Sequence, residues 1–288
     1  MAALQHKIDF AVVFEVKNAN PNGDPLNSNR PRTNYESVGE VTDVCLKRKL
    51  RDRLMEEGHA IFVQSDDRKR DEATSLRDRA EKELGKKLDS PSIAKQACEK
   101  WLDVRAFGQL FAFKATGGKK GKGKEEGEEE STDLAVSIGI RGPVTVQSAF
   151  SLAPVEVTST QITKSVSGED PKAGKSRASD TMGMKHRVDH GVYRFFGSMN
   201  PQLAERTGFS DADADAIKKT LPRLFENDAS SARPEGSMRV LKVVWWKHSS
   251  KAGQYSSARV HGSLDVAPDG AITLKPLAGL QPEEFDGF

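Results

Sequence analysis

The chain has 288 residues, which is enough for one large domain or two modest ones. Its formal net charge is only +2, so the overall charge does not attract a polyanion, and any nucleic-acid site must come from local clusters of Lys and Arg. Hydrophobic residues make up 36% and charged residues 30% of the chain, a polar mixture that predicts solvated insertions around a core.

The cysteines and the N-terminal segment bear on the cellular compartment. Cys45 and Cys98 both lie in helical sequence contexts, which argues against a disulfide framework and fits a reducing compartment. No apolar run approaches membrane length, and MAALQHKIDF lacks the charged-then-apolar order of a signal peptide. We therefore expect a cytoplasmic protein with no membrane partner.

The first predicted element is a β-strand over residues 8–16, IDFAVVFEV, in which every second residue is apolar. A loop over residues 18–34, NANPNGDPLNSNRPRTN, follows it directly. Asn, Asp, Gly and Pro close turns through local hydrogen bonds and special backbone angles. A connection of this length is more often a functional loop than a plain turn, so the sequence predicts a binding loop at the end of a strand.

The next predicted element is a helix over residues 41–58, which Thr42 caps and Gly58 ends. Its apolar stripe consists of Leu46, Leu50 and Leu54. The remaining positions carry a run of cations, namely Lys47, Arg48, Lys49, Arg51 and Arg53. Such a run is typical of a solvated helix face, and the alternative is a set of phosphate contacts.

A charged insertion follows over residues 65–103. Two segments within or overlapping it, residues 70–88 and 90–104, have the apolar spacing of amphipathic helices. Residues 117–130, GGKKGKGKEEGEEE, contain no apolar side chain and cannot bury enough surface to fold. The sequence therefore predicts a helical insertion that ends in a disordered loop.

The second half of the chain predicts strands around one protruding hairpin. Residues 134–157 predict two strands, and a polar excursion over residues 158–183 is followed by a returning strand, MKHRVDHGVYRFFG. Residues 209–227 predict a helix that Ser210 and Asp213 cap. RVLKVVWW then predicts a strand, and RVHGSLDV, the turn PDG and AITLKPL predict a C-terminal hairpin. This order of elements predicts an α+β fold with a ferredoxin-like, RNA-recognition-type sheet and two insertions.

Three segments partly match known functional motifs, but each lacks a residue that its motif requires. Residues 118–124 have the spacing of a phosphate-binding loop, but Glu125 stands where a Ser or Thr must bind magnesium. His186 and His190 have a spacing that metal ligands use, but no third ligand is near them in a segment predicted to be a strand. Residues 105–111, RAFGQLF, resemble the aromatic motif of RNA-recognition domains without its later aromatic residues. We therefore predict no metal, no cofactor and no catalytic residue.

The cations that remain are distributed over several segments. Arg30 and Arg32 lie in the loop, Arg141 lies beside a glycine, and further Lys and Arg residues follow the predicted hairpin. Long polyanions are held by many modest phosphate contacts, whereas catalysis concentrates perturbed groups in one pocket. The pattern favours binding of a nucleic acid over catalysis.

Four blocks of sequence carry a resemblance to a known family. They are FEVKNANPNGDPLNSNRPRTN, WLDVRAFGQLF, SIGIRGPVTVQSAFSLAPV and KHRVDHGVYRFFGSMNP. In this order they resemble the Cas7 family, and within it the backbone subunit of the type I-C CRISPR surveillance complex (Cascade). The blocks span most of the chain, apart from the charged loop and the C-terminal hairpin.

The resemblance implies a hand-shaped protein. Its palm would consist of residues 1–64, 134–157 and 185–288, the last of these with the C-terminal hairpin. Residues 65–133 would form helical fingers with a disordered loop at 115–132, and residues 158–184 a thumb. Copies would stack head to tail along a guide RNA, a contact that does not close and so yields a helical filament.

The resemblance also assigns roles to individual residues. The RNA-binding residues it implies are Asn18, Asn20, Asn22, Arg30, Arg32, Asn34, Lys47, Arg51, Arg141, Gln147 and Ser148. The thumb residues it implies are Thr163, Lys164, Lys172, Lys175, Arg177, Met182, Met184 and Lys185, with the two methionines as apolar wedges that interrupt base stacking.

The implied function is that of a non-catalytic subunit, which polymerises along CRISPR RNA and presents it for pairing with target DNA in antiviral defence. The implied partners are the guide RNA, the target DNA, further copies of the chain, the guide-processing, large and small subunits, and a recruited helicase-nuclease. One alternative is a ribonuclease that cuts target RNA with Asp24, as backbone subunits of type III complexes do with a loop aspartate. Another is a ferredoxin-like scaffold that binds no nucleic acid.

Overall fold

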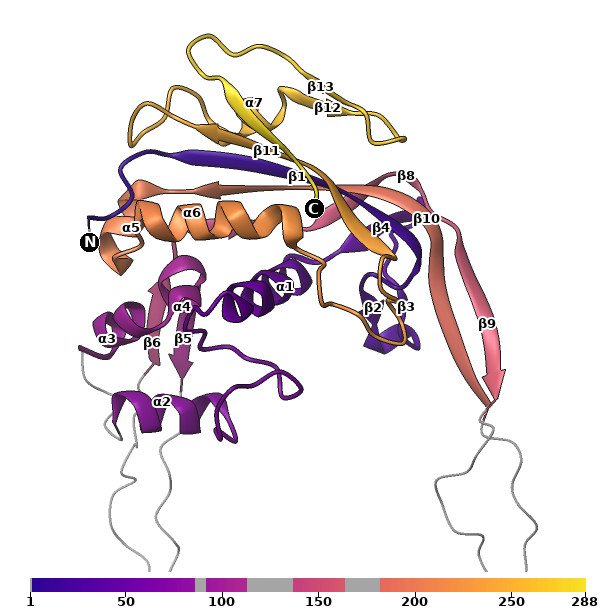
Figure 1. Cartoon of the computed structure of the whole chain (residues 1–288), viewed down its shortest axis with the longest axis horizontal. Helices are drawn as coiled ribbons and strands as arrows, with labels where there is room; N and C mark the ends of the chain where they lie inside the picture. Colours follow the sequence, from indigo (N-terminus) through magenta and orange to yellow (C-terminus); the bar gives the residue numbers. More distant parts are fainter. Residues whose placement is uncertain (1, 86–91, 113–136, 164–181) are drawn as a thin grey trace, which may run out of the picture.

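The computed structural model describes residues 2–85, 92–112, 137–163 and 182–288. Its centre is an eight-stranded antiparallel sheet in the order β14-β11-β1-β10-β8-β4, and β7 and β9 also pair with β10 (Figure 1). The strands are β1 (Ile8–Ala19), β4 (Val38–Val41), β7 (Val144–Val146), β8 (Ala149–Pro154), β9 (Val157–Thr163), β10 (Met182–Met199), β11 (Met238–Lys247) and β14 (Pro282–Asp286). Helices accompany this sheet, so the predicted α+β class is confirmed.

Strand β1 lies in the middle of the sheet and is buried on both faces. Phe10, Val12 and Phe14 point to one face and are fully buried, as the alternating pattern predicts. Ala11 and Val13 point to the other face and are equally buried. Coverage of both faces explains why IDFAVVFEV contains so few polar residues.

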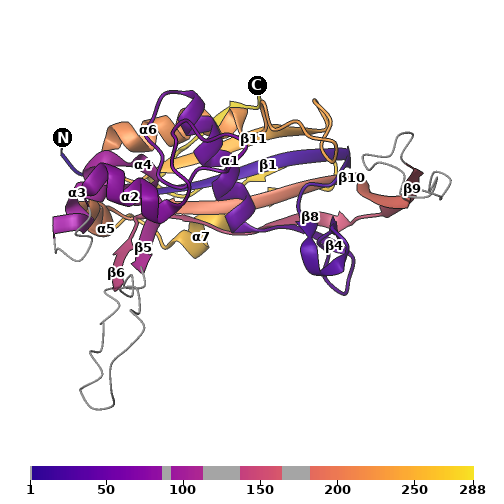
Figure 2. The same cartoon turned by 90° about the horizontal axis from the view of Figure 1, so that it is seen from below.

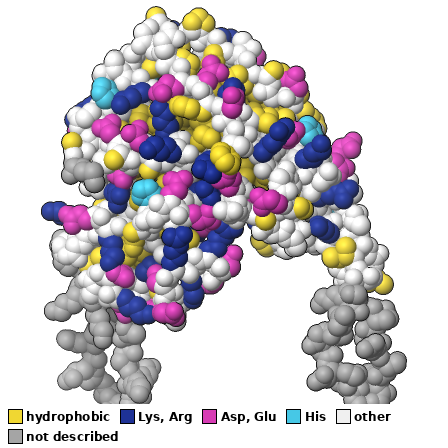
Figure 3. Space-filling view, in the orientation of Figure 1, with side chains coloured by type: hydrophobic (Ala, Val, Ile, Leu, Met, Phe, Trp, Pro, Cys, Tyr) yellow, Lys and Arg dark blue, Asp and Glu magenta, His cyan; other side chains and the backbone are white. Residues whose placement is uncertain are grey.

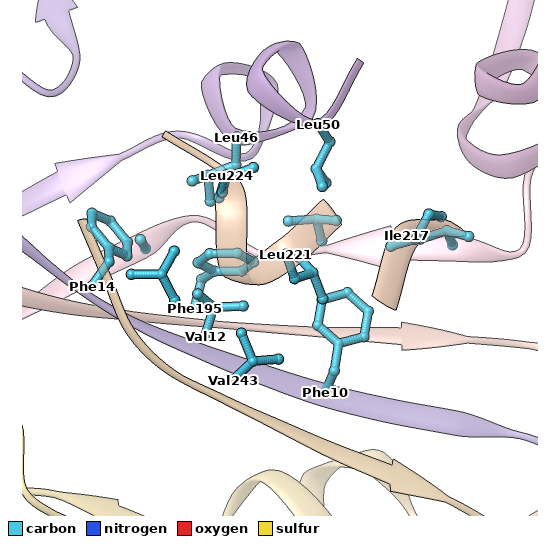
Figure 4. Close-up of a cluster of buried hydrophobic side chains, with 14 of the residues drawn as sticks. Phe10, Val12, Phe14, Leu46, Leu50, Phe195, Ile217, Leu221, Leu224 and Val243 are labelled. Carbon is cyan, nitrogen blue, oxygen red and sulfur yellow. The ribbon is translucent and has the colours of Figure 1, made fainter. Parts of the chain in front are cut away.

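Helices cover the first face of the sheet. They are α1 (Asp43–Glu56), α5 (Pro201–Thr207) and α6 (Asp211–Thr220), with the 3-10 turn η2 (Leu221–Arg223). Leu46 and Leu50 of α1 and Ile217 of α6 meet the side chains of β1 in one core (Figure 4). The predicted caps are confirmed, because the Thr42 hydroxyl accepts the N–H of Cys45 and Ser210 forms a reciprocal capping box with Asp213.

The C-terminal segment covers the second face. It consists of α7 (Ser257–His261), β12 (Leu264–Val266) and β13 (Ile272–Leu274), and Val260, Leu264 and Val266 pack on the core around Val13. The predicted hairpin is therefore present but shorter than expected, since Arg259–His261 are helical and Ser256 caps them. The hairpin also does not end the chain, because residues 282–286 form β14 at the edge of the sheet beside β11.

A third core lies below the helices in Figure 1. We call the elements around it the finger lobe: α2 (Leu76–Leu84), α3 (Ser92–Lys100), α4 (Leu102–Phe107) and the ribbon of β5 (Gly108–Ala112) and β6 (Ser137–Arg141). Phe62, Trp101 and Phe111 form its centre. The helix predicted over residues 70–88 is confirmed as the shorter α2, which ends at Leu84. The segment predicted over residues 90–104 contains α3 and the start of α4, which Trp101 separates.

Two details of this lobe differ from the sequence predictions. Residues 105–107 belong to helix α4 and not to an aromatic strand, because a strand begins only at Gly108. Residues 137–154 form three strands instead of two, and the first, β6, pairs with β5 outside the large sheet. Gly142 permits this change of partner, since a Cβ there would lie 2.2 Å from the carbonyl oxygen of Ala106. The loop predicted to be disordered, residues 115–132, lies outside the described residues.

The predicted hairpin forms an arm that bends away from the sheet (Figure 1). Strand β10 is 18 residues long, and its inner part pairs with β1 while its outer part, residues 182–188, pairs with β9. We call β9 and residues 182–188 the arm. The returning strand is confirmed as β10, but the outgoing strand β9 covers residues 157–163, where the sequence predicted the start of the polar excursion. Most of that predicted excursion, residues 164–181, lies outside the described residues. Within the described ranges no helix is long and apolar enough to cross a membrane.

Candidate nucleic-acid interface

The loop after β1 is a folded element. It contains β2 (Gly23–Asp24), the 3-10 turn η1 (Pro25–Asn27) and β3 (Arg30–Pro31), and β2 pairs with β3. Positive φ angles at Ser28 (51°) and Asn29 (57°) make the reversal between the two short strands. We call residues 18–41 the grip loop. Figure 2 shows it from below, around the label β4, as a compact projection beside β8.

Asparagine side chains shape the grip loop from within. The Asn34 side-chain oxygen accepts the N–H groups of Glu36 and Val38, both at 2.9 Å. The Asn22 side-chain oxygen accepts the backbone N–H of Thr42 at 3.0 Å and its hydroxyl at 2.9 Å, which fixes the loop to the start of α1. These asparagines therefore hold the loop in shape before they offer anything to a ligand.

Two further asparagines lie where the loop leaves the sheet. Asn20 is 6% exposed, and its amide donates to the carbonyl oxygen of Asn29 at 2.6 Å. Asn18 is exposed and has a φ of 53°, a left-handed conformation that asparagine adopts more easily than most residues. Of the asparagines predicted to bind RNA, Asn18 is thus the one whose side chain is turned outward at the end of β1.

Among the described residues, each loop arginine has one side-chain partner. Nη1 of Arg30 donates to the Ser159 hydroxyl of the arm at 2.9 Å. Nη2 of Arg32 lies 3.3 Å from a carboxylate oxygen of Asp24. That same oxygen accepts the N–H of Leu26 at 3.3 Å, so Asp24 closes a turn within the loop. A guanidinium has five N–H donors, and both arginines keep donors for a ligand.

The basic residues of α1 do not form a free cationic face, and the prediction of a solvated run is wrong in this respect. Lys47 pairs with Asp43 at 2.9 Å and Arg48 with Asp52 at 2.5 Å, each one helical turn apart. The remaining three are paired as well: Lys49 with Asp228, Arg51 with Asp103 and Arg53 with Glu56.

Arg51 shows most clearly what this pairing does. Its Nε donates at 3.0 Å to Asp103, which is 1% exposed and also accepts the N–H groups of Phe62 and Val63. The guanidinium also lies over the ring of Phe107, 5.1 Å from its centre. Burial lowers the pKa of Arg51, and the neighbouring Asp103 opposes that shift. Arg51 therefore joins α1 to the finger lobe.

The other predicted RNA-binding residues lie on both sides of α1. Ser148 follows β7, and its hydroxyl accepts the N–H of Asp43 at 3.3 Å, next to the exposed Gln147. Arg141 is exposed at the end of β6, and within the described ranges it has no ion-pair partner. Figure 1 shows α1 between the strand β6 that carries Arg141 and the grip loop.

The described thumb residues are exposed on the arm. Met182 (59% exposed) and Met184 (54%) alternate along one face of β10, and Lys185 lies on the other face. Thr163 is exposed at the end of β9. The other predicted thumb cations, Lys164, Lys172, Lys175 and Arg177, lie outside the described residues.

Together these elements frame one concave side of the molecule. Figure 3 shows a recess between the finger lobe and the arm, and Figure 1 places α1 and the grip loop between the two. Sequence reasoning missed Ser159 of the arm, which contacts a loop residue 129 positions away. No local pattern signals such a contact. It also missed the exposed side chains of Leu26 and Tyr35 at the outer end of the loop.

Comparison with known proteins places the chain in a family. Residues 6–281 match the family model described as CRISPR-associated protein Cas7. The chain belongs to the Cas7 family. A CRISPR-associated protein Cas7 from Haloferax volcanii is 26% identical over 280 residues, which cover 94% of this chain and 78% of that protein. The resemblance inferred from the four sequence blocks is confirmed at the level of the family.

Two solved structures also show similarity. One is a chain of a CRISPR RNA-guided surveillance complex before nicking, with 17% identity, a TM-score of 0.45 and coverage of 83% of this chain and 75% of that one. The other is a chain of a CRISPR RNA-guided surveillance complex, with 17% identity, a TM-score of 0.41 and coverage of 83% and 68%.

Proposed function

We propose that this Cas7 family member is a non-catalytic, guide-RNA-binding backbone subunit of a Cascade-type complex, of the type I-C branch. The observation that carries the proposal is the grip loop, which holds Arg30 and Arg32 by one partner each beside the recess and leaves further N–H donors on both. Arginine donors of this kind bind phosphates through paired hydrogen bonds and carry no sequence information. A loop that grips the backbone suits a guide whose bases must remain free for pairing.

The arrangement of the sheet supports a ferredoxin-like palm. Four of its strands follow the order β11-β1-β10-β8, with α1 between β1 and β8 in the chain and α6 between β10 and β11. That order is expected for a βαββαβ unit. In our proposal, residues 1–64, 142–157 and 185–288 build the palm, residues 65–133 and 137–141 the fingers, and residues 158–184 the thumb. The pairing of β6 with β5 indicates that residues 137–141 belong with the fingers.

The proposed RNA contacts fall into two groups. Arg30, Arg32, Asn18, Arg141 and Gln147 offer exposed or partly exposed polar groups and are the ones we propose to touch the RNA backbone. Asn20, Asn22, Asn34, Ser148, Lys47 and Arg51 are already engaged within the chain, and we propose that they shape the surface. Met182 and Met184 are exposed on one face of the arm, as apolar wedges between bases require.

The partners follow from the same proposal. Copies of the chain would stack head to tail along the RNA, in an open contact whose length the guide sets. The guide would pair with target DNA, and the guide-processing, large and small subunits and a recruited helicase-nuclease would complete the system.

Nucleic acid that co-purifies with the full chain is the direct test. The chain should be expressed together with a CRISPR RNA, purified at low salt and measured for the ratio of absorbance at 260 and 280 nm. We expect a high ratio that falls after ribonuclease treatment and not after deoxyribonuclease treatment. A protein free of nucleic acid that also fails to bind single-stranded RNA at low salt would contradict the proposal and favour a scaffold without nucleic acid.

A further inference from the structure

A hydrogen-bonded set of three polar side chains, Arg30, Ser159 and His186, links the grip loop to both strands of the arm. Arg30 lies in β3 of the loop, Ser159 in β9 and His186 in β10. Nη1 of Arg30 donates to the Ser159 hydroxyl oxygen at 2.9 Å, and that oxygen lies 2.8 Å from Nδ1 of His186. Ser159 and His186 are directly opposite each other in the β9–β10 register, so both side chains point to the same face of the arm.

The hydrogen bonds of these three side chains run in one direction, from Arg30 through Ser159 to His186. A guanidinium can only donate, so the Ser159 oxygen accepts from Arg30. The hydroxyl proton of Ser159 is then free to bind Nδ1 of His186, which accepts it when the ring carries its proton on Nε2. His186 is 7% exposed, and its Nε2 has no hydrogen-bond partner among the described residues. His186 is thus the buried member of this set of side chains, and Arg30 is the member that keeps free N–H donors.

The three side chains lie between the buried base of the arm and its exposed outer part. Met184 and Met182 follow His186 at alternate positions along β10, so they share its face of the arm and lie further out. Val188, one alternate position inward, is fully buried against the base of the loop. The Arg30 guanidinium therefore lies between the buried base of the arm and the exposed methionines further out.

The contact with Ser159 restricts how Arg30 points. A free arginine side chain has many rotamers, and their loss on binding reduces affinity. One Nη1 hydrogen bond to a fixed hydroxyl limits those rotamers and leaves Nε and Nη2, which together form one two-pronged edge of the guanidinium. That edge matches two oxygens of a phosphate group.

We infer that Ser159 and His186 are positioning residues, which orient Arg30 toward a backbone phosphate of the RNA at the junction of the grip loop and the arm. The inference rests on the proposed function, since it names how one of the proposed contacts is prepared. It makes the strands of the arm part of the phosphate grip, in addition to any contact that the arm makes with bases.

A double-mutant cycle tests this inference. The probe is a fluorescein-labelled single-stranded RNA of mixed sequence, and its affinity is measured for the full chain by anisotropy. We expect Arg30→Ala to lower the affinity about tenfold, as the loss of a charged hydrogen-bonding group does, and Ser159→Ala to lower it about threefold through the freed rotamers. In the Arg30→Ala background, Ser159→Ala should have no further effect, because Ser159 acts only through Arg30.

Conservative variants separate orientation from structural damage. Ser159→Thr keeps the hydroxyl and should retain wild-type affinity. His186→Asn keeps an acceptor oxygen near the position of Nδ1 and should retain more affinity than His186→Leu, which keeps only bulk. Thr160→Ala is the matched control, since Thr160 is the next residue of β9, points to the opposite face and is exposed. It should leave the affinity unchanged.

The outcomes distinguish this inference from the proposed function. If the wild-type chain binds no RNA, the proposed function fails. If it binds RNA but Ser159→Ala costs nothing, or costs the same with and without Arg30, RNA binding stands and the positioning role is wrong. If Ser159→Thr loses as much affinity as Ser159→Ala while both variants keep the unfolding midpoint of the wild type, the hydroxyl is not the group that matters, which also overturns the inference.

Discussion

A carboxylate oxygen of Asp24 lies 3.3 Å from Nη2 of Arg32 and also accepts the backbone N–H of Leu26 at 3.3 Å. One side chain thus closes the turn of the grip loop and holds one of its arginines. In this structure the contacts of Asp24 are those of a turn-forming residue.

We therefore predict that Asp24→Ala loosens the loop and weakens RNA binding by about threefold, the scale of a partly exposed ion pair. Asp24→Asn is the matched control, because its side-chain oxygen still accepts the N–H of Leu26 while the charge is lost. We expect the asparagine variant to bind RNA more tightly than the alanine variant. Fluorescence anisotropy with labelled RNA measures both.

The same aspartate decides between a binding subunit and a ribonuclease. The wild-type complex, assembled on its guide, should be incubated with labelled complementary RNA and magnesium. We expect the labelled RNA to remain intact. Regular cuts that disappear in Asp24→Ala, while assembly persists, would show that the loop aspartate is catalytic and that the non-catalytic assignment is wrong.

The loop arginines should bind RNA without regard to sequence. We predict that Arg30→Ala and Arg32→Ala weaken binding equally for unrelated RNAs, because phosphate contacts contain no sequence information. Each lost contact should flatten the plot of log affinity against log salt concentration by about 0.7 for a single strand. Arg239→Ala is the control, since Arg239 is 64% exposed and pairs with Glu15 on the face of β1 opposite to α1 and α6. A change in sequence preference with an unchanged salt slope would mean that the loop arginines read bases.

Arg51 should matter for stability and not for RNA contact. We predict that Arg51→Met lowers the free energy of unfolding by about 3 kcal/mol, because it leaves the carboxylate of Asp103 buried without its cation. Urea denaturation measures this loss. At a urea-free condition where the variant is folded, its RNA affinity and salt slope should equal those of the wild type. A flattened salt slope at full stability would show instead that Arg51 contacts phosphate.

The difference between Arg51 and the loop arginines also shows what the sequence could predict. The caps at Thr42 and Ser210 and the alternation in β1 depend on residues a few positions apart, and the patterns predicted them correctly. The carboxylates that pair with Arg51 and Lys49 lie 52 and 179 residues away in the chain. The composition of the helix therefore predicted a free cationic face where the fold builds paired ions.

Short elements escaped prediction for a related reason. Helix α7 has five residues, too few to show a helical period. Strand β14, PEEFD, has no strand-like alternation and forms because the edge of β11 offers hydrogen-bonding partners. The location of the candidate site was predictable from the length and composition of the grip loop. The contact between Arg30 and Ser159 was not, since it depends on where the arm lies relative to the loop.

A buried ion cluster around Asp9 should make the free energy of unfolding depend on pH. Asp9 is fully buried, lies 3.1 Å from the Lys7 ammonium and 2.8 Å from Nε2 of His248, and joins β1 to the C-terminal segment. Burial alone would raise the pKa of Asp9, but the nearby side chains of His261, Ser257 and His248 outweigh burial, and with the charge of Lys7 they lower that pKa well below its usual range.

The sign of the effect follows from this lowered pKa. The stabilisation from Asp9 is complete above the pKa of an unfolded aspartate, about 3.9, and is lost as the pH falls from there toward the lower pKa of the folded state. We predict that Asp9→Asn is less stable than wild type at neutral pH and loses less stability on acidification below about pH 4. Asp189→Asn is the control, because that carboxylate is 38% exposed and screened by solvent. Equal acid sensitivity of Asp9→Asn and wild type, in urea denaturation at a series of pH values, would contradict this account.

Assembly along RNA tests the central claim most directly. The full chain is mixed with RNAs of stepwise increasing length, and the mass of the particles is measured by mass photometry or native mass spectrometry. We predict that the mass rises in steps of one 31.5 kDa subunit plus its share of RNA as the RNA lengthens. A single subunit on every RNA, whatever its length, would contradict the account of this chain as the repeating backbone of an RNA-guided complex.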